Sequence, residues 1–114
     1  MRTNFNFSAE NIKMVRADTL EFGVVITDDS GAPQDIDAAY FTVRDSGTLL
    51  FQKSLNNGII RNAAGEYAVR VAPADTKTIT PDRYDYQFVI CIGNDVYTIL
   101  YGIFEIMQNI VEVS

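Results

Sequence analysis

Two pairs of aspartates, Asp28 with Asp29 and Asp35 with Asp37, are the side chains with the most obvious capacity for chemistry. Carboxylate oxygens are the ligands that hard cations such as Ca²⁺ prefer, so residues 28–37 are a candidate cation-binding loop. Their spacing matches no calcium-loop pattern, and Asp, Gly and Pro are also common in solvated turns. We therefore predict no metal or cofactor, and cation binding by this loop is kept as an alternative.

The sequence lacks the groups that most enzymes use for catalysis. It contains no histidine, so it has neither an imidazole base nor an imidazole metal ligand. Its single cysteine, Cys91, has no partner for an internal disulfide and no base that would favour a thiolate, which predicts a packing role within a strand. Glycine-rich phosphate loops are absent as well. We expect a protein that is not an enzyme.

The charge balance argues against nucleic acid as a partner. Fifteen acidic against nine basic residues give a net charge of −6, and the basic residues form no stripe with aromatic side chains. Residues 1–17 carry three basic side chains and one acidic, whereas residues 84–114 carry four acidic side chains and no basic one. The chain is thus basic at its start and acidic at its end.

At 114 residues the chain is long enough for one core, so we predict a single domain over residues 1–114. Residues 1–8 are a candidate N-terminal arm and residues 108–114 a candidate C-terminal tail. No apolar run approaches the roughly 20 residues that a membrane-spanning helix needs, so no membrane partner is expected. The N-terminus lacks the apolar segment of a secretory signal, and synthesis in the cytoplasm is expected.

A long antiparallel hairpin over residues 83–107 is the strongest structural signal. Two apolar runs, rich in β-branched and aromatic residues, are joined by a Gly-Asn-Asp turn at residues 93–95. In the first arm, alternate residues from Tyr84 to Ile92 are apolar, as in a strand with one buried face. The second arm is apolar on both faces, and both must be covered.

The rest of the chain shows the same period of two, with a turn about every eight to twelve residues. Strands are predicted at residues 18–29, 36–44, 48–55, 59–61 and 66–71, and residues 3–7 are a candidate edge strand or docking arm. Pro73, Asp75 and Thr76 predict one helical turn at residues 73–78 that crosses between two sheets. The fold class predicted from these elements is all-β: an immunoglobulin-like antiparallel β-sandwich of about seven to nine strands.

The tyrosines have alternative uses in such a sandwich. Tyr84 follows the predicted crossing turn, where immunoglobulin-like domains often carry a tyrosine whose hydroxyl pins the preceding connection; ordinary core packing would select the same residue. Tyr40, Tyr97 and Tyr101 would either contact carbohydrate or protein, or pack on a sheet face. A small carbohydrate- or cation-binding module is therefore one function that the sequence permits.

Four segments occur in a distinctive order along the chain. They are DTLEFGVVITDDSG, AAYFTVRDSGTLLFQKSL, GEYAVRVAPADT and RYDYQFVICIGNDVYTILYGIFEI. The sharpest part is the Pro-Ala-Asp-Thr turn followed by Tyr84 and Tyr86. This order resembles the small immunoglobulin-like modules of tailed-phage and prophage structural proteins, in particular the N-terminal domain of the baseplate upper protein family. Such modules commonly have a glycine just before the first tyrosine, where this chain has Asp82 and Arg83.

The resemblance implies a virion protein that acts through protein–protein contacts and carries no catalytic residues. It would be a tail or baseplate component, an adaptor or a capsid decoration protein. Its partners would be other copies of itself, in a homo-oligomer or a multi-copy assembly, and other virion proteins. We accordingly predict a non-enzymatic structural protein of a bacteriophage particle.

The apolar second arm suggests where copies would meet. A five-residue N-terminal segment spans only about 17 Å and cannot cover both the arm and the tail. The basic start of one copy would complement the acidic end of another in charge, which predicts a heterologous contact. The predicted assembly interface comprises Tyr97, Ile99, Tyr101, Ile103, Ile110, Val111, Phe5 and Phe7.

Overall fold

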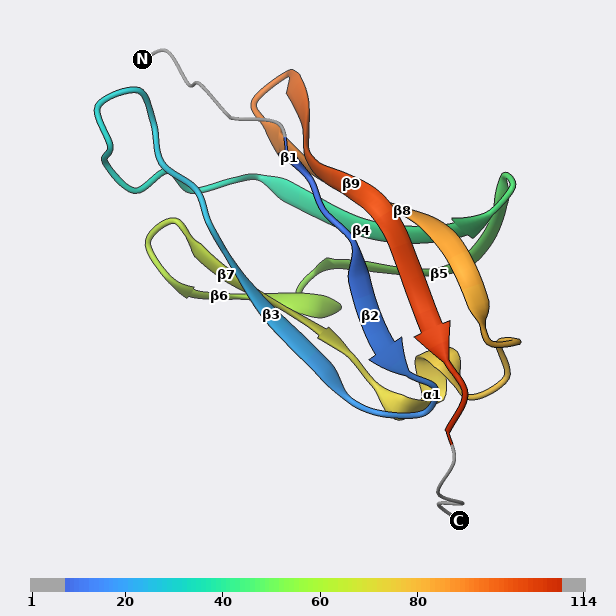
Figure 1. Ribbon diagram of the computed structural model, residues 1–114. Helices are drawn as coiled ribbons and strands as arrows, with labels where there is room; N and C mark the ends of the chain where they lie inside the picture. Colours follow the sequence, from blue (N-terminus) through green and yellow to red (C-terminus); the bar gives the residue numbers. More distant parts are fainter. Residues whose placement is uncertain (1–7, 110–114) are drawn as a thin grey trace.

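The computed structural model describes residues 8–109, and over this range it contains nine strands and one short helix (Figure 1). The strands are β1 (Ser8–Ala9), β2 (Ile12–Val15), β3 (Leu20–Val25), β4 (Ala38–Asp45), β5 (Thr48–Leu55), β6 (Gly58–Ala63), β7 (Glu66–Val71), β8 (Asp82–Ile92) and β9 (Asp95–Met107). Helix α1 (Pro73–Thr76) lies between β7 and β8, and within the described range no helix is long and apolar enough to span a membrane. The predicted all-β domain with one helical turn before a long hairpin is confirmed.

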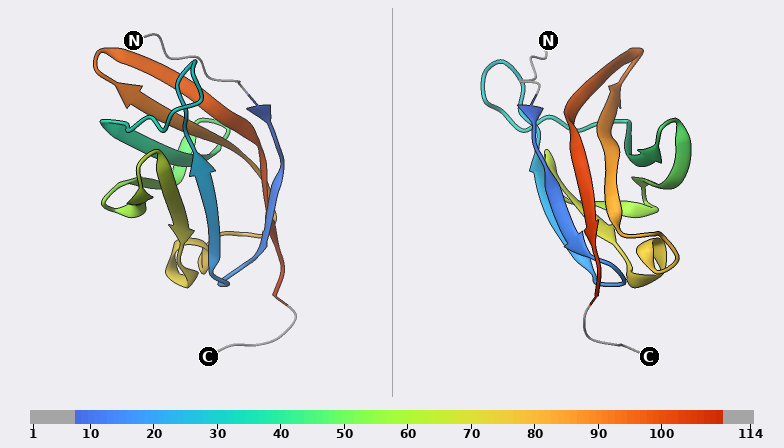
Figure 2. Two further views of the ribbon diagram at one scale, coloured as in Figure 1. Left: turned by 90° about the vertical axis from the view of Figure 1, so that its left-hand side faces the viewer. Right: turned by 45° about the vertical axis from the view of Figure 1, so that its right-hand side comes forward.

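Hydrogen bonding connects the strands in the order β1-β9-β8-β4-β5-β6-β7-β3, and β2 also pairs with β9. The sheet passes from one layer to the other between β5 and β6, which share two parallel residue pairs. One layer therefore contains β4, β5, β8 and β9, and the other contains β3, β6 and β7 (Figure 2). Two facing layers, with a strand order of this kind and a crossing before β8, are typical of immunoglobulin-like sandwiches. The chain has an immunoglobulin-like β-sandwich fold, as the sequence predicts.

The core lies between the two layers and is built from alternate residues of each strand. Phe41 on β4 is fully buried, and its ring lies 5.4, 5.6 and 5.9 Å, centroid to centroid, from the rings of Phe22, Tyr86 and Phe104. Aromatic contacts at such distances add to the apolar burial that drives folding. The period-two pattern therefore predicted the inward residues of β4 and β8 correctly.

Backbone with positive φ explains the choice of residues at two of the turns. Asn56 and Gly58, where β5 connects to β6, have φ angles of 68° and 96°, and Gly93, between β8 and β9, has a φ of 59°. Glycine adopts such angles without steric strain, and asparagine tolerates them better than most residues. The turns predicted at these two places are confirmed.

Helix α1 is held in place by hydrogen bonds that its own side chains accept. The carboxylate of Asp75 accepts a hydrogen bond from the N–H of Ala72 at 2.7 Å and pairs with the Lys53 ammonium group at 2.6 Å. The hydroxyl oxygen of Thr76, which is fully buried, accepts a hydrogen bond from the N–H of Ala17 at 2.9 Å. The helix is thereby bonded both to β5 and to the connection between β2 and β3.

The N-terminal strands differ from the prediction, which assumed an antiparallel sandwich and placed no strand at residues 12–15. Both β1 and β2 run parallel to β9, with Ala9 opposite Tyr101 and Ile12 opposite Phe104. A four-residue strand is too short to display a periodicity, and its partner lies some ninety positions away, so local sequence pattern carries no sign of the pairing. The candidate strand at residues 3–7 lies outside the described residues.

Candidate functional site

Strands β4, β8 and β9 present a surface on the side of their layer that faces away from the core. Because side chains alternate along each strand, the outward residues of the three strands line up in cross-strand rows. These rows are Ala38, Cys91 and Val96; Tyr40, Val89 and Thr98; Thr42, Gln87 and Tyr101; and Arg44, Asp85 and Ile103. We call this surface the outer face, its first two rows the apolar end, and its last two rows the polar end.

The apolar end exposes side chains of a kind that usually lies in a core. Val96 is 66% exposed and Tyr40 is 38% exposed, with Val89 and Cys91 half-buried beside them. The predicted packing position of Cys91 within a strand is confirmed. Single exposed apolar residues are ordinary, but here they are contiguous across three strands. Such a patch favours contact with another protein.

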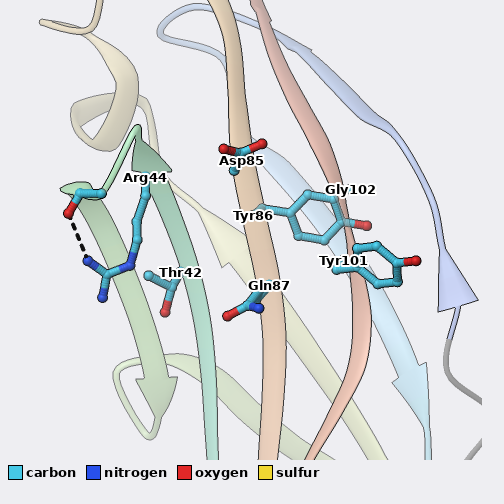
Figure 3. A pocket seen from close by; sticks show the side chains of 8 residues that line it. Thr42, Arg44, Asp85, Tyr86, Gln87, Tyr101 and Gly102 are labelled. Carbon is cyan, nitrogen blue, oxygen red and sulfur yellow. Dashed lines mark hydrogen bonds between the residues drawn. The ribbon is translucent and has the colours of Figure 1, made fainter.

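The polar end holds a shallow pocket of about 390 Å³. Thr42 and Arg44 lie on one side of β8 and Tyr101 on the other, with Asp85 and Gln87 on β8 itself (Figure 3). The Nη1 atom of Arg44 donates a hydrogen bond to a backbone carbonyl in the β4–β5 turn at 3.3 Å, which positions the guanidinium at the rim. The pocket brings hydrogen-bond donors, acceptors and an exposed aromatic ring together.

The prediction that Tyr97, Ile99, Tyr101 and Ile103 share one outward face is wrong. A β-bulge in the pairing of β8 with β9 gives β9 one extra residue, Ile99. The extra residue reverses the alternation along the strand, so that Ile99 is 7% exposed and Tyr97 packs against the core. Of the four residues, Tyr101 and Ile103 belong to the outer face.

The chain's own N-terminal strands cover the edge of β9. Strand β2 places Lys13 opposite Glu105, and the Nε atom of Arg83 on β8 lies 3.6 Å from a carboxylate oxygen of Glu105. The basic start and the acidic end of the chain thus meet within one molecule. The predicted heterologous contact between the ends of two copies loses its support from charge. Phe5, Phe7, Ile110 and Val111, the rest of the predicted interface, lie outside the described residues.

Gly102 on β9 and Tyr86 on β8 determine how the N-terminal segment docks. A Cβ atom at Gly102 would lie 2.0 Å from the carbonyl oxygen of Glu10, so no larger residue fits while the segment stays in place. The Tyr86 ring extends from β8 toward Gly102 (Figure 3), and its hydroxyl donates to the Glu10 carbonyl oxygen at 2.8 Å. The Oδ1 atom of Asn11 accepts from the N–H of Ile103 at 3.2 Å. Burial, and secondarily the charge of Glu10, raises the pKa of the Tyr86 hydroxyl.

Pinning and core packing are the two roles that the sequence leaves open for Tyr84, and its side chain does both. Its hydroxyl donates a hydrogen bond to the carbonyl oxygen of Thr80, at 2.5 Å, in the connection between α1 and β8. The side chain is buried, and burial, followed by the charges of Asp82 and Asp45, raises the pKa of its hydroxyl. This arrangement is the tyrosine corner of immunoglobulin-like domains, and it is structural.

Asp28 and Asp37 serve as hydrogen-bond acceptors for the loops around them. The Asp28 carboxylate accepts from the Ser30 hydroxyl at 2.6 Å and from the N–H of Ala32 at 3.1 Å, and the bond from Ser30 is the main cause of its lowered pKa. The Asp37 carboxylate accepts from the N–H of Gly93 at 2.6 Å, in the β8–β9 turn. Both carboxylates stabilise loop conformations.

Asp35 joins the same loop to β6 and β7. Its two carboxylate oxygens accept hydrogen bonds from Arg61 at 3.0 and 3.1 Å, and the N–H of Gly65 donates to it at 2.9 Å. The hydrogen bond from Arg61 is the main cause of the lowered pKa of Asp35. Among residues 8–109, no group of three or more His, Cys, Asp or Glu side chains gathers into a metal-binding arrangement. Asp28, Asp35 and Asp37 are thus engaged in separate structural contacts.

Comparison with known proteins gives a match in structure and none in sequence. No protein-family model matches the chain, and no curated protein matches it. Among solved structures, the extracellular domain of the voltage-gated sodium channel beta4 subunit is similar over 96% of this chain and 99% of that chain, with 10% sequence identity and a TM-score of 0.48. That domain forms parallel homodimers that explain its role in cell–cell adhesion. The function of the present chain is accordingly inferred from its own residues.

Proposed function

We propose that the protein is a non-enzymatic structural component of a bacteriophage particle and that it assembles through the apolar end of its outer face. The order of its sequence segments resembles that in phage structural modules, and this resemblance supports a role in the phage particle. The exposure of Tyr40 and Val96, with the half-buried Val89 and Cys91 of β8 between them, supports the assembly surface. Further copies of the chain and other virion proteins are the proposed partners, and the virion is the proposed location.

The exposure of Val96 is the observation that carries the assembly surface. A partner that covered Val96, Tyr40 and the half-buried Val89 would remove apolar area from water, which contributes about 25 cal/mol for each Å² buried. One such patch on a small domain gives a weak contact. In a particle many copies are held together, so weak contacts act jointly and the assembly becomes stable.

Support for a non-enzymatic role comes from the surroundings of the sole thiol. Cys91 lies half-buried in a row with Ala38 and Val96, both of which are apolar. A thiol in such surroundings acts as a small apolar side chain. It therefore belongs with the proposed contact surface.

Size-exclusion chromatography with light scattering over a series of concentrations tests the surface. We expect the mass of the wild-type protein to rise with concentration and the mass of Val96→Lys to stay at that of a monomer. Val25→Lys is the matched control, because Val25 is 72% exposed but lies on β3 in the other layer. A wild-type protein that stays monomeric at every concentration, or an equal loss in both variants, would contradict the proposed surface.

The proposed role in a phage particle is tested separately, by identifying the neighbouring genes and the proteins in purified particles. Neighbouring terminase, portal or tail genes, and detection of the chain by mass spectrometry in particles from the organism that encodes it, are the expected results. A neighbourhood without phage genes together with particles free of the chain would exclude the virion role, whatever the outcome for self-association.

A further inference from the structure

The pocket at the polar end is separate from the apolar end and has the size of a ligand site. Its volume of about 390 Å³ lies toward the lower end of the roughly 300–1,000 Å³ that small-molecule sites occupy. Three adjacent strands line it, and strands in a sheet lie about 4.8 Å apart. The side chains of Thr42, Gln87 and Tyr101, which form one cross-strand row, therefore stand next to one another along a single ligand-sized surface.

The hydrogen-bonding groups of the pocket are balanced between donors and acceptors. Arg44 supplies donors, Asp85 supplies acceptors, and Thr42 and Gln87 supply both. One cationic and one anionic side chain leave the pocket without net charge. Within residues 8–109, the side chains of Thr42, Asp85 and Gln87 take part in no hydrogen bond or ion pair, so these groups are available to a ligand. Such a set suits a neutral molecule with many hydroxyl groups.

Tyr101 adds an apolar surface to this polar set. Its side chain is 38% exposed and lies at one side of the pocket (Figure 3). A sugar ring has a weakly apolar C–H face and a rim of hydroxyls that donate and accept hydrogen bonds. An aromatic ring beside hydroxyl, amide, guanidinium and carboxylate groups matches both features.

We propose that this pocket binds one or two units of a neutral saccharide, with the Tyr101 ring against a sugar face and Asp85, Gln87 and Thr42 bonded to its hydroxyls. Asp85 repels anions such as phosphate, and Arg44 repels cations. A single carboxylate is also far short of the six to eight oxygen ligands, roughly, that Ca²⁺ takes. Because the pocket opens on the surface of the sheet, the bound units can belong to a longer polysaccharide. This inference does not depend on the virion role.

Titration of the intact protein, followed by two-dimensional NMR of its amide signals, tests the ligand class. The probes are the methyl glycosides of glucose, galactose, mannose, rhamnose and N-acetylglucosamine, with inorganic phosphate and calcium chloride as charged comparisons. We expect at least one glycoside to shift the signals of residues 85–87 and 101–102 with a dissociation constant of about 1 mM. Signal shifts with phosphate or calcium but with no glycoside would overturn the proposal. The absence of shifts with every probe would overturn it as well.

Two tyrosines of equal exposure provide the matched test of the site. Tyr101→Ala is expected to raise the dissociation constant at least about tenfold, whereas Tyr101→Phe, which keeps the ring, retains binding. Tyr40→Ala is the control, because Tyr40 is also 38% exposed on the outer face but lies at the apolar end. Unchanged signals from the core show that each variant is folded. Equal weakening by Tyr101→Ala and Tyr40→Ala would mean that the pocket is not the binding site.

Discussion

The hydroxyl of Tyr86 on β8 donates a hydrogen bond to the backbone carbonyl oxygen of Glu10, which lies 76 positions earlier in the chain, at 2.8 Å. This bond forms beside Gly102 on β9, where the absence of a side chain lets the N-terminal segment approach the strand. Three residues from distant parts of the sequence thus hold the first strands against the last. Their docking covers an edge of the sheet that would otherwise offer unpaired backbone groups to other chains.

Removing the Tyr86 hydroxyl should loosen the N-terminal segment. Tyr86→Phe keeps the buried ring but loses the hydrogen bond to Glu10, which costs about 1 kcal/mol of folding free energy. We expect faster hydrogen exchange of the amides in β2 than in the wild-type protein. Tyr84→Phe is the comparison, since its lost bond lies in the α1–β8 connection; equal exchange of β2 in both variants would disagree with the docking role of Tyr86.

Filling the space at Gly102 should displace the same segment more strongly. In Gly102→Ala the new Cβ would meet the Glu10 carbonyl oxygen at 2.0 Å, and both groups are backbone-linked, so the segment must move. We expect a loss of more than about 1 kcal/mol in the free energy of unfolding, measured by urea denaturation. Gly23→Ala on β3 is the control, because its Cβ would make an ordinary contact of 3.8 Å. A Gly102→Ala protein as stable as Gly23→Ala would refute the account.

Replacing the buried hydroxyl of α1 should destabilise the whole domain. Thr76→Val preserves the shape of the side chain but leaves the N–H of Ala17 without its acceptor, at a cost of about 1–3 kcal/mol. Thermal unfolding is the measurement, and Thr78→Val, at an exposed position next to the helix, should unfold like the wild-type protein. If the two variants unfold at the same temperature, the Thr76 bond does not stabilise the fold.

The stability of the domain should depend on acid pH through Asp35. Hydrogen bonds from Arg61 and Gly65 hold the pKa of Asp35 below its ordinary value of 3.8, so just below that pH the unfolded chain binds more protons than the folded one. This contribution to stability is present at neutral pH and is lost as the pH falls through the folded-state pKa. Asp35→Asn should therefore be less stable than the wild-type protein at pH 7, by a margin that narrows below about pH 4.

Denaturant unfolding at a series of pH values measures this difference. Asp29→Asn changes an exposed aspartate of the same loop for which, within the described residues, no side-chain hydrogen bond is found, so its curve should follow that of the wild-type protein. A margin between Asp35→Asn and the wild-type protein that stays constant from pH 7 to low pH would show that the carboxylate of Asp35 is not the titrating group.

Features that depend on neighbouring residues were predictable from the sequence. The hairpin of β8 and β9, the turns at Gly58 and Gly93 and the crossing at Pro73 all follow from local residue type and a period of two. The hydroxyl contact of Tyr84 was one of two roles that its place after the crossing allowed. The alternation also identified the buried residues of β4 and β8. In a strand that keeps its register, side chains alternate strictly between the two faces, so the alternation in the sequence identifies the buried residues.

Features that depend on contacts between distant residues were settled only in three dimensions. The extra residue Ile99 reverses the two faces of β9, and an alternation that is apolar on both sides gives no sign of where a bulge lies. The opposite charges of the two ends suggested contact between copies, whereas β2 brings Lys13 beside Glu105 within one chain. The outer face, with its apolar end and its pocket, exists only once β4, β8 and β9 are in register. Side-chain periodicity shows which residues of a strand point toward the core. The neighbours of the outward residues are decided by the pairing of strands that lie far apart in the chain.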